Sequence, residues 1–254
     1  MVLCIIILDI IVNINLKQSN IKFNKGTVII ASAGPGSVDL ITLNLINILK
    51  LADVVIYDAL VNEEILSFCK KNVKLIYAGK IKEKRACTQT EINDWLVKYS
   101  HKKNRVLRLK SGDVSFFSRA SQEINFLKKN NIKINIFSGI TSSQAAIHNS
   151  KKIFFNKSEI CNFITGHKMI KNKKKFDYEL ITKNGGKIFI YMGVSQIEEI
   201  TNNLLDKGID KNEKVTIVYN ASRKSQKIFH TNLNKCCGLI KKKKIVSPAI
   251  IIIK

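Results

Sequence analysis

The hydrophobic positions of the chain form short continuous runs that alternate with segments of helical periodicity. The apolar run 28–31 ends in a turn of small residues at 32–36, and leucine and isoleucine then recur at helical spacing between Leu40 and Leu49. A second apolar run follows at 52–57. A strand, a glycine turn, a helix and a strand form a βαβ unit, and continuously apolar strands are typical of a parallel sheet covered on both faces. The pattern predicts an α/β protein.

The same alternation continues along the chain and divides it into two domains. Further strands are expected at 73–77, 105–109, 134–137, 160–164, 187–192, 215–219 and 249–253, and further helices at 89–99, 121–129 and 196–207. The pattern lapses around 149–157. We therefore expect an N-terminal α/β domain at 26–148 and a C-terminal α/β domain at 149–254.

The first 25 residues are expected to form an N-terminal extension ahead of these domains. Residues 2–12 are apolar, but Asp9 interrupts them, and the run is well short of the ~20 residues that a membrane span requires. No basic segment precedes the run and no small-residue cleavage site follows it, which argues against a signal peptide. We therefore expect no membrane association.

The net charge is strongly positive. The chain has 43 Lys and Arg against 19 Asp and Glu, which leaves +24. Such an excess fits either a polyanionic partner or a compositional bias that places Lys at tolerant surface positions. The lysines are scattered along the chain and aromatic residues make up only 7%. Because a nucleic-acid interface usually combines a basic stripe with aromatic residues, we expect no nucleic-acid partner.

Cysteine and histidine give no sign of a metal site. The six cysteines form no C-x-x-C pair, and the four histidines lack the H-E-x-x-H spacing. The composition therefore predicts reduced thiols, no bound metal and a cytoplasmic location.

Turns of small residues follow several of the predicted strands, at 34–36, 111–113, 139–142 and 192–193. Any one of them is explained by the needs of a turn. Because ligands of open α/β sheets bind at the carboxyl ends of the strands, four such turns together indicate a cleft lined by backbone. The first turn lacks the lysine of a P-loop and the spacing of a dinucleotide fingerprint, and Pro35 has no N–H to offer. A phosphate ligand is therefore not indicated.

Seven motifs in a fixed order resemble the tetrapyrrole methylase superfamily. They are Ala-Gly-Pro-Gly at 33–36, Tyr-Asp-Ala-Leu-Val at 57–61, Gly-Lys at 79–80, Arg-Leu-Lys-Ser-Gly-Asp at 108–113, Gly-Ile-Thr at 139–141, Thr-Gly-His at 165–167 and Tyr-Met-Gly at 191–193. The resemblance covers about 26–254. It implies two α/β domains of the tetrapyrrole methylase type with S-adenosylmethionine (SAM) in the inter-domain cleft, usually in a homodimer.

The implied reaction is methylation of uroporphyrinogen III at C2 and C7, which gives precorrin-2 on the route to sirohaem or cobalamin. Two alternatives are a methyltransferase for a later precorrin intermediate and a decayed SAM-binding homologue. Methyl transfer is an in-line displacement from a sulfonium, which requires the reacting atoms at about 3–3.5 Å and no metal.

The resemblance also assigns roles to individual residues. Asp58 matches the acid–base carboxylate of the family and Lys80 its proton-donor partner. From the residues alone, Asp58 as a helix cap and Lys80 as a surface lysine stay open. The implied cofactor contacts are Pro35, Ser111, Gly112, Asp113, Phe116, Thr141, Ser142, Met192 and Ala221. Because the substrate bears eight carboxylates and arginine is scarce in this chain, Arg85, Arg108 and Arg119 are the expected substrate contacts.

Several loops depart from the family pattern by losing glycine or proline. Ser32 and Ser111 stand where the family has glycine, Val114 and Ser138 stand where it has proline, and 154–158 replace a proline-containing segment. These changes are what a decayed homologue would show. The retention of Asp58, Lys80, Gly112, Asp113 and Thr141 favours a working enzyme.

Overall fold

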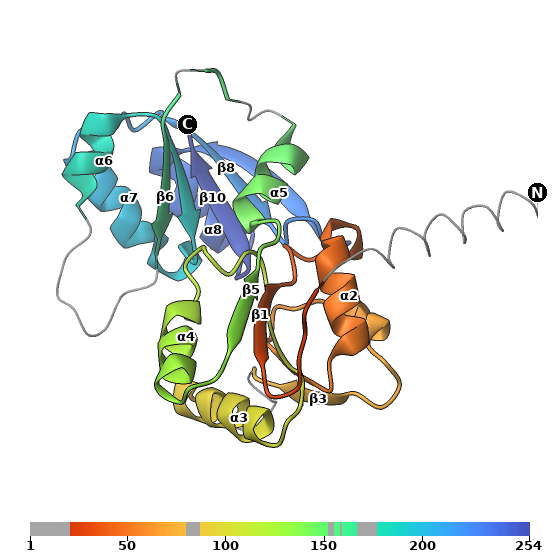
Figure 1. Ribbon diagram of the computed structural model, residues 1–254. Helices are drawn as coiled ribbons and strands as arrows, with labels where there is room; N and C mark the ends of the chain where they lie inside the picture. The colour runs from red at the N-terminus through yellow and green to blue at the C-terminus, as the bar shows by residue number, and fades with distance from the viewer. Residues whose placement is uncertain (1–20, 80–86, 152–154, 158, 167–176) are drawn as a thin grey trace, which may run out of the picture. The chain divides into compact units, whose positions relative to one another are not determined.

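The computed structural model describes residues 21–79, 87–151, 155–157, 159–166 and 177–254. The chain divides into two compact units, Met1–Ile140 and Thr141–Lys254, and each is built around one five-stranded sheet (Figure 1). The prediction of two α/β domains is confirmed.

The first unit has an all-parallel sheet. Its strands are β1 (Val28–Ser32), β2 (Val54–Tyr57), β3 (Lys74–Tyr77), β4 (Val106–Lys110) and β5 (Ile134–Phe137), in the order β3-β2-β4-β1-β5. The helices are α2 (Leu43–Leu51), α3 (Gln89–His101) and α4 (Ala120–Lys129), with 3₁₀ turns η1 (Val38–Leu40) and η2 (Glu63–Phe68). All five carboxyl ends therefore share one edge, as expected from the apolar runs.

Both faces of this sheet are covered. Ile29 and Leu107 pack with Leu45 of α2 on one face, whereas alternate residues such as Ile30 pack with Leu96 of α3 on the other. This explains why the strands are apolar at successive positions. Helix starts are specified locally, because the Thr42 Oγ1 accepts the Leu45 N–H at 3.2 Å and Thr88 forms a capping box with Glu91.

The end of the predicted extension 1–25 belongs to this unit. Phe23 is buried in the same core as Ile29, and Ile21 packs against that core. The Asn135 side chain also donates to the Lys22 carbonyl oxygen at 3.4 Å. Residues 1–20 lie outside the described residues.

The second unit has a mixed sheet. Its strands are β6 (Cys161–Thr165), β7 (Lys187–Tyr191), β8 (Lys214–Tyr219), β9 (Lys227–Asn232) and β10 (Ala249–Ile253), in the order β6-β7-β10-β8-β9. The helices are α5 (Ser142–Ser150), α6 (Tyr178–Asn184), α7 (Ile197–Asp206) and α8 (Cys236–Lys242), with 3₁₀ turns η3 (Val194–Gln196) and η4 (Leu233–Lys235). Strand β10 is antiparallel to both β7 and β8, so β6, β7 and β8 end at one edge.

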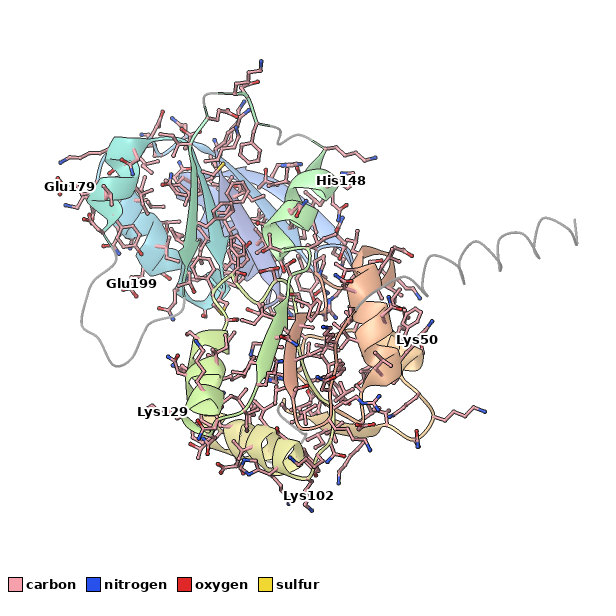
Figure 2. The ribbon with its side chains drawn as sticks, viewed as in Figure 1. Lys50, Lys102, Lys129, His148, Glu179 and Glu199 are labelled. Atoms are coloured by element: carbon pink, nitrogen blue, oxygen red, sulfur yellow. The ribbon has the colours of Figure 1, made fainter. Side chains whose placement is uncertain are left out.

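The division between the units falls before α5, whereas the sequence placed the domain boundary at 148/149, within this helix. Helix α5 packs against β8 and β10 of the second sheet, so its place is decided by tertiary contacts. None of the described helices is long and apolar enough to cross a membrane. Figure 2 shows Lys50, Lys102 and Lys129 projecting from separate places on the first unit, which agrees with dispersed rather than clustered charge.

Candidate active site

Asp58 follows β2 directly at the carboxyl edge of the first sheet. Its backbone N–H donates to the Leu109 carbonyl oxygen at 3.2 Å, which fixes the end of β2 against β4. The Arg108 Nη2 donates to the Asp58 Oδ1, and the Lys110 Nζ lies 3.6 Å from its Oδ2. The Asp58 side chain is 31% exposed. A carboxylate thus stands at the sheet edge between two cations.

The two cations come from one face of β4 and are themselves buried. The side chains of Arg108 and Lys110 are only 2% and 6% exposed. Both contact the Glu123 Oε1 of α4, at 3.1 Å from the Arg108 Nε and 3.1 Å from the Lys110 Nζ. Burial would lower the pKa of Arg108, but the charges of Asp58 and Glu123 raise it, so the guanidinium is a fixed positive charge.

Arg108 was expected to contact substrate, but the structure buries its side chain within the first unit. Its guanidinium lies beneath Asp58, where the Nη1 also donates to the Ile56 carbonyl oxygen at 3.3 Å. The side chain is therefore fully engaged within the first unit. Arg119 is exposed at the start of α4. Lys80 and Arg85 lie outside the described residues.

The turns after β1 and β4 are joined by their backbones. The Gly34 N–H donates to the Gly112 carbonyl oxygen at 3.1 Å, and the Gly112 N–H donates back to Gly34 at 2.7 Å. Gly34 has φ +73°, and a Cβ there would lie 2.8 Å from the Leu40 carbonyl oxygen, so only glycine suits the position. This pairing brings Pro35 and the 111–113 loop, two predicted cofactor contacts, to the same edge.

Asp113 secures these turns with its carboxylate. Its Oδ2 accepts the Gly139 N–H at 2.7 Å, and its Oδ1 accepts the Ser115 N–H at 2.7 Å. Asp113 is buried. The carboxylate was expected to contact the cofactor, but the structure commits both of its oxygens to backbone, so its side chain holds the β4 loop against the end of β5.

Two departures from the family pattern form a hydrogen-bonded pair. The Val114 N–H donates to the Ser32 Oγ at 3.0 Å, and the same hydroxyl lies 3.1 Å from the Phe137 carbonyl oxygen. A glycine at 32 has no acceptor side chain, and a proline at 114 has no N–H. Ser32 therefore supplies the acceptor for the N–H that Val114 introduces in place of a proline.

Four predicted cofactor contacts lie in the second unit. Thr141 precedes α5, and its hydroxyl hydrogen bonds the Tyr191 hydroxyl at 2.6 Å. Tyr191 in turn donates to the Ser143 Oγ at 2.6 Å, so the start of α5 is tied to the end of β7. Ser142 lies within this start, and Met192 follows Tyr191 with φ +52° and 43% exposure.

Ala221 lies in the loop after β8, which is also tied to α5. The Gln226 Oε1 accepts the Ser222 N–H at 2.7 Å and the Asn149 Nδ2 of α5 at 2.7 Å. Ala221 itself is buried. The structure therefore brings Thr141, Ser142 and Met192 together around Tyr191 and anchors the Ala221 loop to the same helix.

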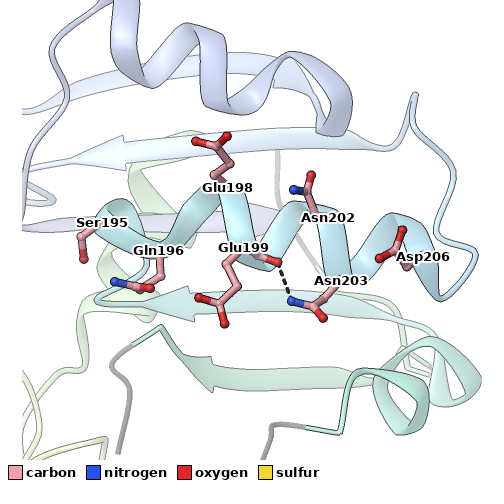
Figure 3. Close-up of a pocket in the computed structure, with 7 residues that line it drawn as sticks. All are labelled: Ser195, Gln196, Glu198, Glu199, Asn202, Asn203 and Asp206. Carbon is pink, nitrogen blue, oxygen red and sulfur yellow. Dashed lines mark hydrogen bonds between the residues drawn. The ribbon is translucent and has the colours of Figure 1, made fainter. Parts of the chain in front are cut away.

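A hollow on the second unit lies apart from these residues. Figure 3 shows it along one side of α7; it is lined by Ser195, Gln196, Glu198, Glu199, Asn202, Asn203 and Asp206. None of the predicted site residues lines it. Its lining is rich in carboxylates and amides, whereas the turns at which the sequence predicts the cofactor consist mainly of small uncharged residues.

Two observations on the described part of the chain concern metal binding and the cysteines Cys69 and Cys236. No group of three or more His, Cys, Asp or Glu that could hold a metal ion occurs there. Burial raises the pKa of Cys69 to about 11 and that of Cys236 to about 12. Both thiols are therefore protonated at neutral pH and are poor nucleophiles.

Three residues of this arrangement were not predicted as site residues: Lys110, Glu123 and Tyr191. A signal existed for the first two. Arg108 and Lys110 alternate with leucine in a strand expected to be buried, and buried cations require a counter-charge. Tyr191 begins the Tyr-Met-Gly motif, but its residue type gave no sign of a role of its own, because a tyrosine at the end of an apolar strand is ordinary in a core.

Comparison with known proteins agrees with the motif order. Residues 27–236 match the family model of the tetrapyrrole (corrin/porphyrin) methylases. The uroporphyrinogen-III C-methyltransferase of Bacillus subtilis is 34% identical, with 90% of each chain covered. That of Methanocaldococcus jannaschii is 35% identical over 90% of this chain and 95% of its own.

A solved structure gives the same result for the fold. It is the uroporphyrin-III C-methyltransferase of Thermus thermophilus complexed with S-adenosylhomocysteine, which aligns with a TM-score of 0.75 at 26% identity over 89% of this chain and 91% of that chain. The family model and the relatives agree with the motif order, and the chain belongs to the tetrapyrrole methylase family.

Proposed function

We propose that the protein transfers methyl groups from SAM to C2 and C7 of uroporphyrinogen III and so forms precorrin-2. The observation that carries this proposal is the pair of uroporphyrinogen-III C-methyltransferases that match nearly the whole chain at 34–35% identity. The geometry supports it, because Asp58 is held at the sheet edge beside the turns at which the family motifs lie.

The proposed cofactor contacts suit an adenosyl donor. Pro35, Gly112, Phe116, Thr141 and Met192 are uncharged, and they combine hydroxyl and apolar surface. When bound, SAM supplies a methyl group activated by its sulfonium. Tyr191 holds Thr141, and Asp113 holds the loop that carries Gly112, so this chain orients the groups that would position the donor. Ser111, Ser142 and Ala221 complete the proposed set.

Asp58 would manage the proton that is lost when a pyrrole carbon is alkylated. Its carboxylate is partly exposed, and its orientation is set by Arg108 and Lys110. General acid–base catalysis of this kind typically contributes ~10²–10⁴-fold in rate. Lys80 follows β3 in sequence and is the proposed proton donor. We propose Arg119 and Arg85 as contacts to the substrate carboxylates, because charge-assisted hydrogen bonds to arginine suit carboxylates.

The homodimer and the cytoplasmic location remain parts of the proposal. The homodimer follows from resemblance to the family, and the cytoplasmic location from the cysteine pattern. Light scattering coupled to gel filtration tests the homodimer: we expect a mass of twice 28.7 kDa, and a monomer at micromolar concentration would contradict it.

Mass spectrometry of the product tests the reaction. Purified protein is incubated with SAM and uroporphyrinogen III under reducing conditions, and we expect a product that carries two added methyl groups. Omission of SAM is the negative control. A parallel reaction with precorrin-2 as the acceptor separates the proposal from its alternative. Unchanged uroporphyrinogen III, or methylation of precorrin-2 alone, would contradict the proposal.

A further inference from the structure

The first unit buries two cations at the centre of its sheet. Arg108 and Lys110 lie on β4, the middle strand of the order β3-β2-β4-β1-β5, on the face that packs against α3 and α4. Their neighbour on that face, Val106, is part of the hydrophobic core. Removing two charges from water is costly, and a buried ionic cluster is often no more stabilising than apolar residues of the same size. The cluster therefore calls for a reason other than stability.

Glu123 provides the counter-charge in an unusual way. Its side chain is fully buried, and its Oε1 accepts from the Arg108 Nε, the Lys110 Nζ and the Gln89 Nε2 (3.3 Å). Its Oε2 has no hydrogen-bond partner within the residues that the structure describes. Glu123 thus holds both cations through one oxygen.

Both cations extend from Glu123 to the same further group, the Asp58 carboxylate. Arg108 binds Glu123 through its Nε and Asp58 through its Nη2. Lys110 lies between the Glu123 Oε1 at 3.1 Å and the Asp58 Oδ2 at 3.6 Å. Each oxygen of Asp58 therefore has its own cation, and Asp58 is the most exposed member of the four.

We propose that Arg108, Lys110 and Glu123 are positioning residues that hold the Asp58 carboxylate in the plane required for methylation. This inference rests on the proposed function. Two cations that are each fixed at their other side by Glu123 restrict both the position and the rotation of the carboxylate. Glu123 then affects turnover although it is fully buried and lies behind the two cations.

The test compares Lys110→Met and Glu123→Gln with the wild type in the uroporphyrinogen III assay. Lys110→Met removes the partner of the Asp58 Oδ2 and leaves the pair of Arg108 and Glu123 intact. Glu123→Gln keeps the shape and the acceptor oxygen but removes the charge. We expect kcat per folded enzyme to fall about tenfold to a hundredfold in both variants, with the KM for SAM and its calorimetric Kd within twofold of wild type. Glu123→Asp, which restores the charge, is expected to recover part of the lost kcat.

Asp53→Asn is the matched control, because Asp53 also lies between two cations, at the opposite end of β2. It is expected to keep wild-type kcat. Wild-type kcat in Lys110→Met, or in folded Glu123→Gln, would overturn the inference while leaving the proposed function intact. An inactive wild type would instead contradict the proposed function. If Glu123→Gln fails to fold, Lys110→Met decides the inference.

Discussion

At each end of β2 a carboxylate lies between two cationic side chains. Before the strand, Asp53 pairs with Lys70 and Arg105. After the strand, Asp58 pairs with Arg108 and Lys110. The two arrangements differ in which partner is buried. The cations around Asp53 are partly exposed, whereas those around Asp58 are buried and share a buried counter-charge.

This difference indicates that the same arrangement, a carboxylate between two cations, serves two different purposes. Asp53 also accepts the backbone N–H of Arg105 at 2.8 Å, so its carboxylate ties the start of β4 to β2 and stabilises the sheet. Asp58 pairs with two cations that Glu123 already holds, and its own side chain is partly exposed to solvent. The ion pairs at the amino end therefore serve the fold. We propose that those at the carboxyl end hold Asp58 for catalysis, in line with ligand binding at the carboxyl ends of strands.

The largest contrast is expected in activity. Asp58→Asn should lower kcat by ~10²–10⁴-fold, because the amide cannot exchange a proton with the substrate. Asp53→Asn should leave kcat within twofold. Steady-state methylation rates of the two variants measure this directly. Equal losses in both variants, or none in either, would remove the distinction between the two ends.

The next largest contrast is expected in stability. Among the described residues, Glu123→Leu leaves Asp58 as the one carboxylate paired with the two buried cations. Breaking a buried pair in this way typically costs about 3–5 kcal/mol. Asp53→Asn should cost about 1–2 kcal/mol, because its partners remain hydrated. Urea unfolding of both variants measures the two free energies. A larger loss of unfolding free energy for Asp53→Asn than for Glu123→Leu would contradict the account of the two ion-pair clusters.

The pH dependence of stability sharpens the assignment of Asp53. Burial alone would raise its pKa, but the hydrogen bonds and charges of Lys70 and Arg105 outweigh burial and lower the pKa below its usual 3.8. A carboxyl with a lowered pKa in the folded state stabilises above its unfolded pKa, and this stabilisation is lost as the pH falls toward the folded value. Below about pH 4, the stability advantage of the wild type over Asp53→Asn should shrink. A stability difference between wild type and Asp53→Asn that stays constant down to pH 2 would contradict the lowered pKa of Asp53.

The smallest effect is expected at the carboxyl edge itself, from the hydrogen bond of Val114 to Ser32. Ser32→Gly should cost about 1 kcal/mol in the wild-type background, because a buried N–H loses its acceptor. In a Val114→Pro background the same change should cost about 0.5–1 kcal/mol less, because no N–H remains there. A double-mutant cycle by urea unfolding isolates this coupling from the general cost of glycine. Strict additivity would show that the two departures are independent.

Much of the fold could be predicted, because its information is local. Strands such as β1 and β2 are apolar at successive positions, which only a doubly covered sheet explains. Strand β9 was missed because its residues are only partly buried at the edge of the second sheet and show no apolar run. The predicted domain boundary at 148/149 falls inside α5, because that helix has a weak sequence pattern of its own and its contacts with β8 and β10 are tertiary.

The candidate site was predictable as a set of turns but not as a set of contacts. The sequence places Asp58 and Asp113 after strands, yet only the structure distinguishes them: Asp113 spends both oxygens on backbone N–H groups, and Asp58 is held by side chains. From the sequence, some acidic residue could be expected as the counter-charge of Arg108 and Lys110. That this residue is Glu123 depends on how α4 packs on the sheet.

Calorimetric titration of the protein with SAM tests the central claim most directly, because every role assigned to the two sets of turns depends on this donor. We predict one saturable site per chain, and weaker binding when Thr141 is changed to Ala, because the 2.6 Å hydrogen bond to Tyr191 is then lost. The absence of any binding heat at several temperatures, from a protein that unfolds cooperatively, would contradict the account and identify the chain as a homologue that no longer binds the donor.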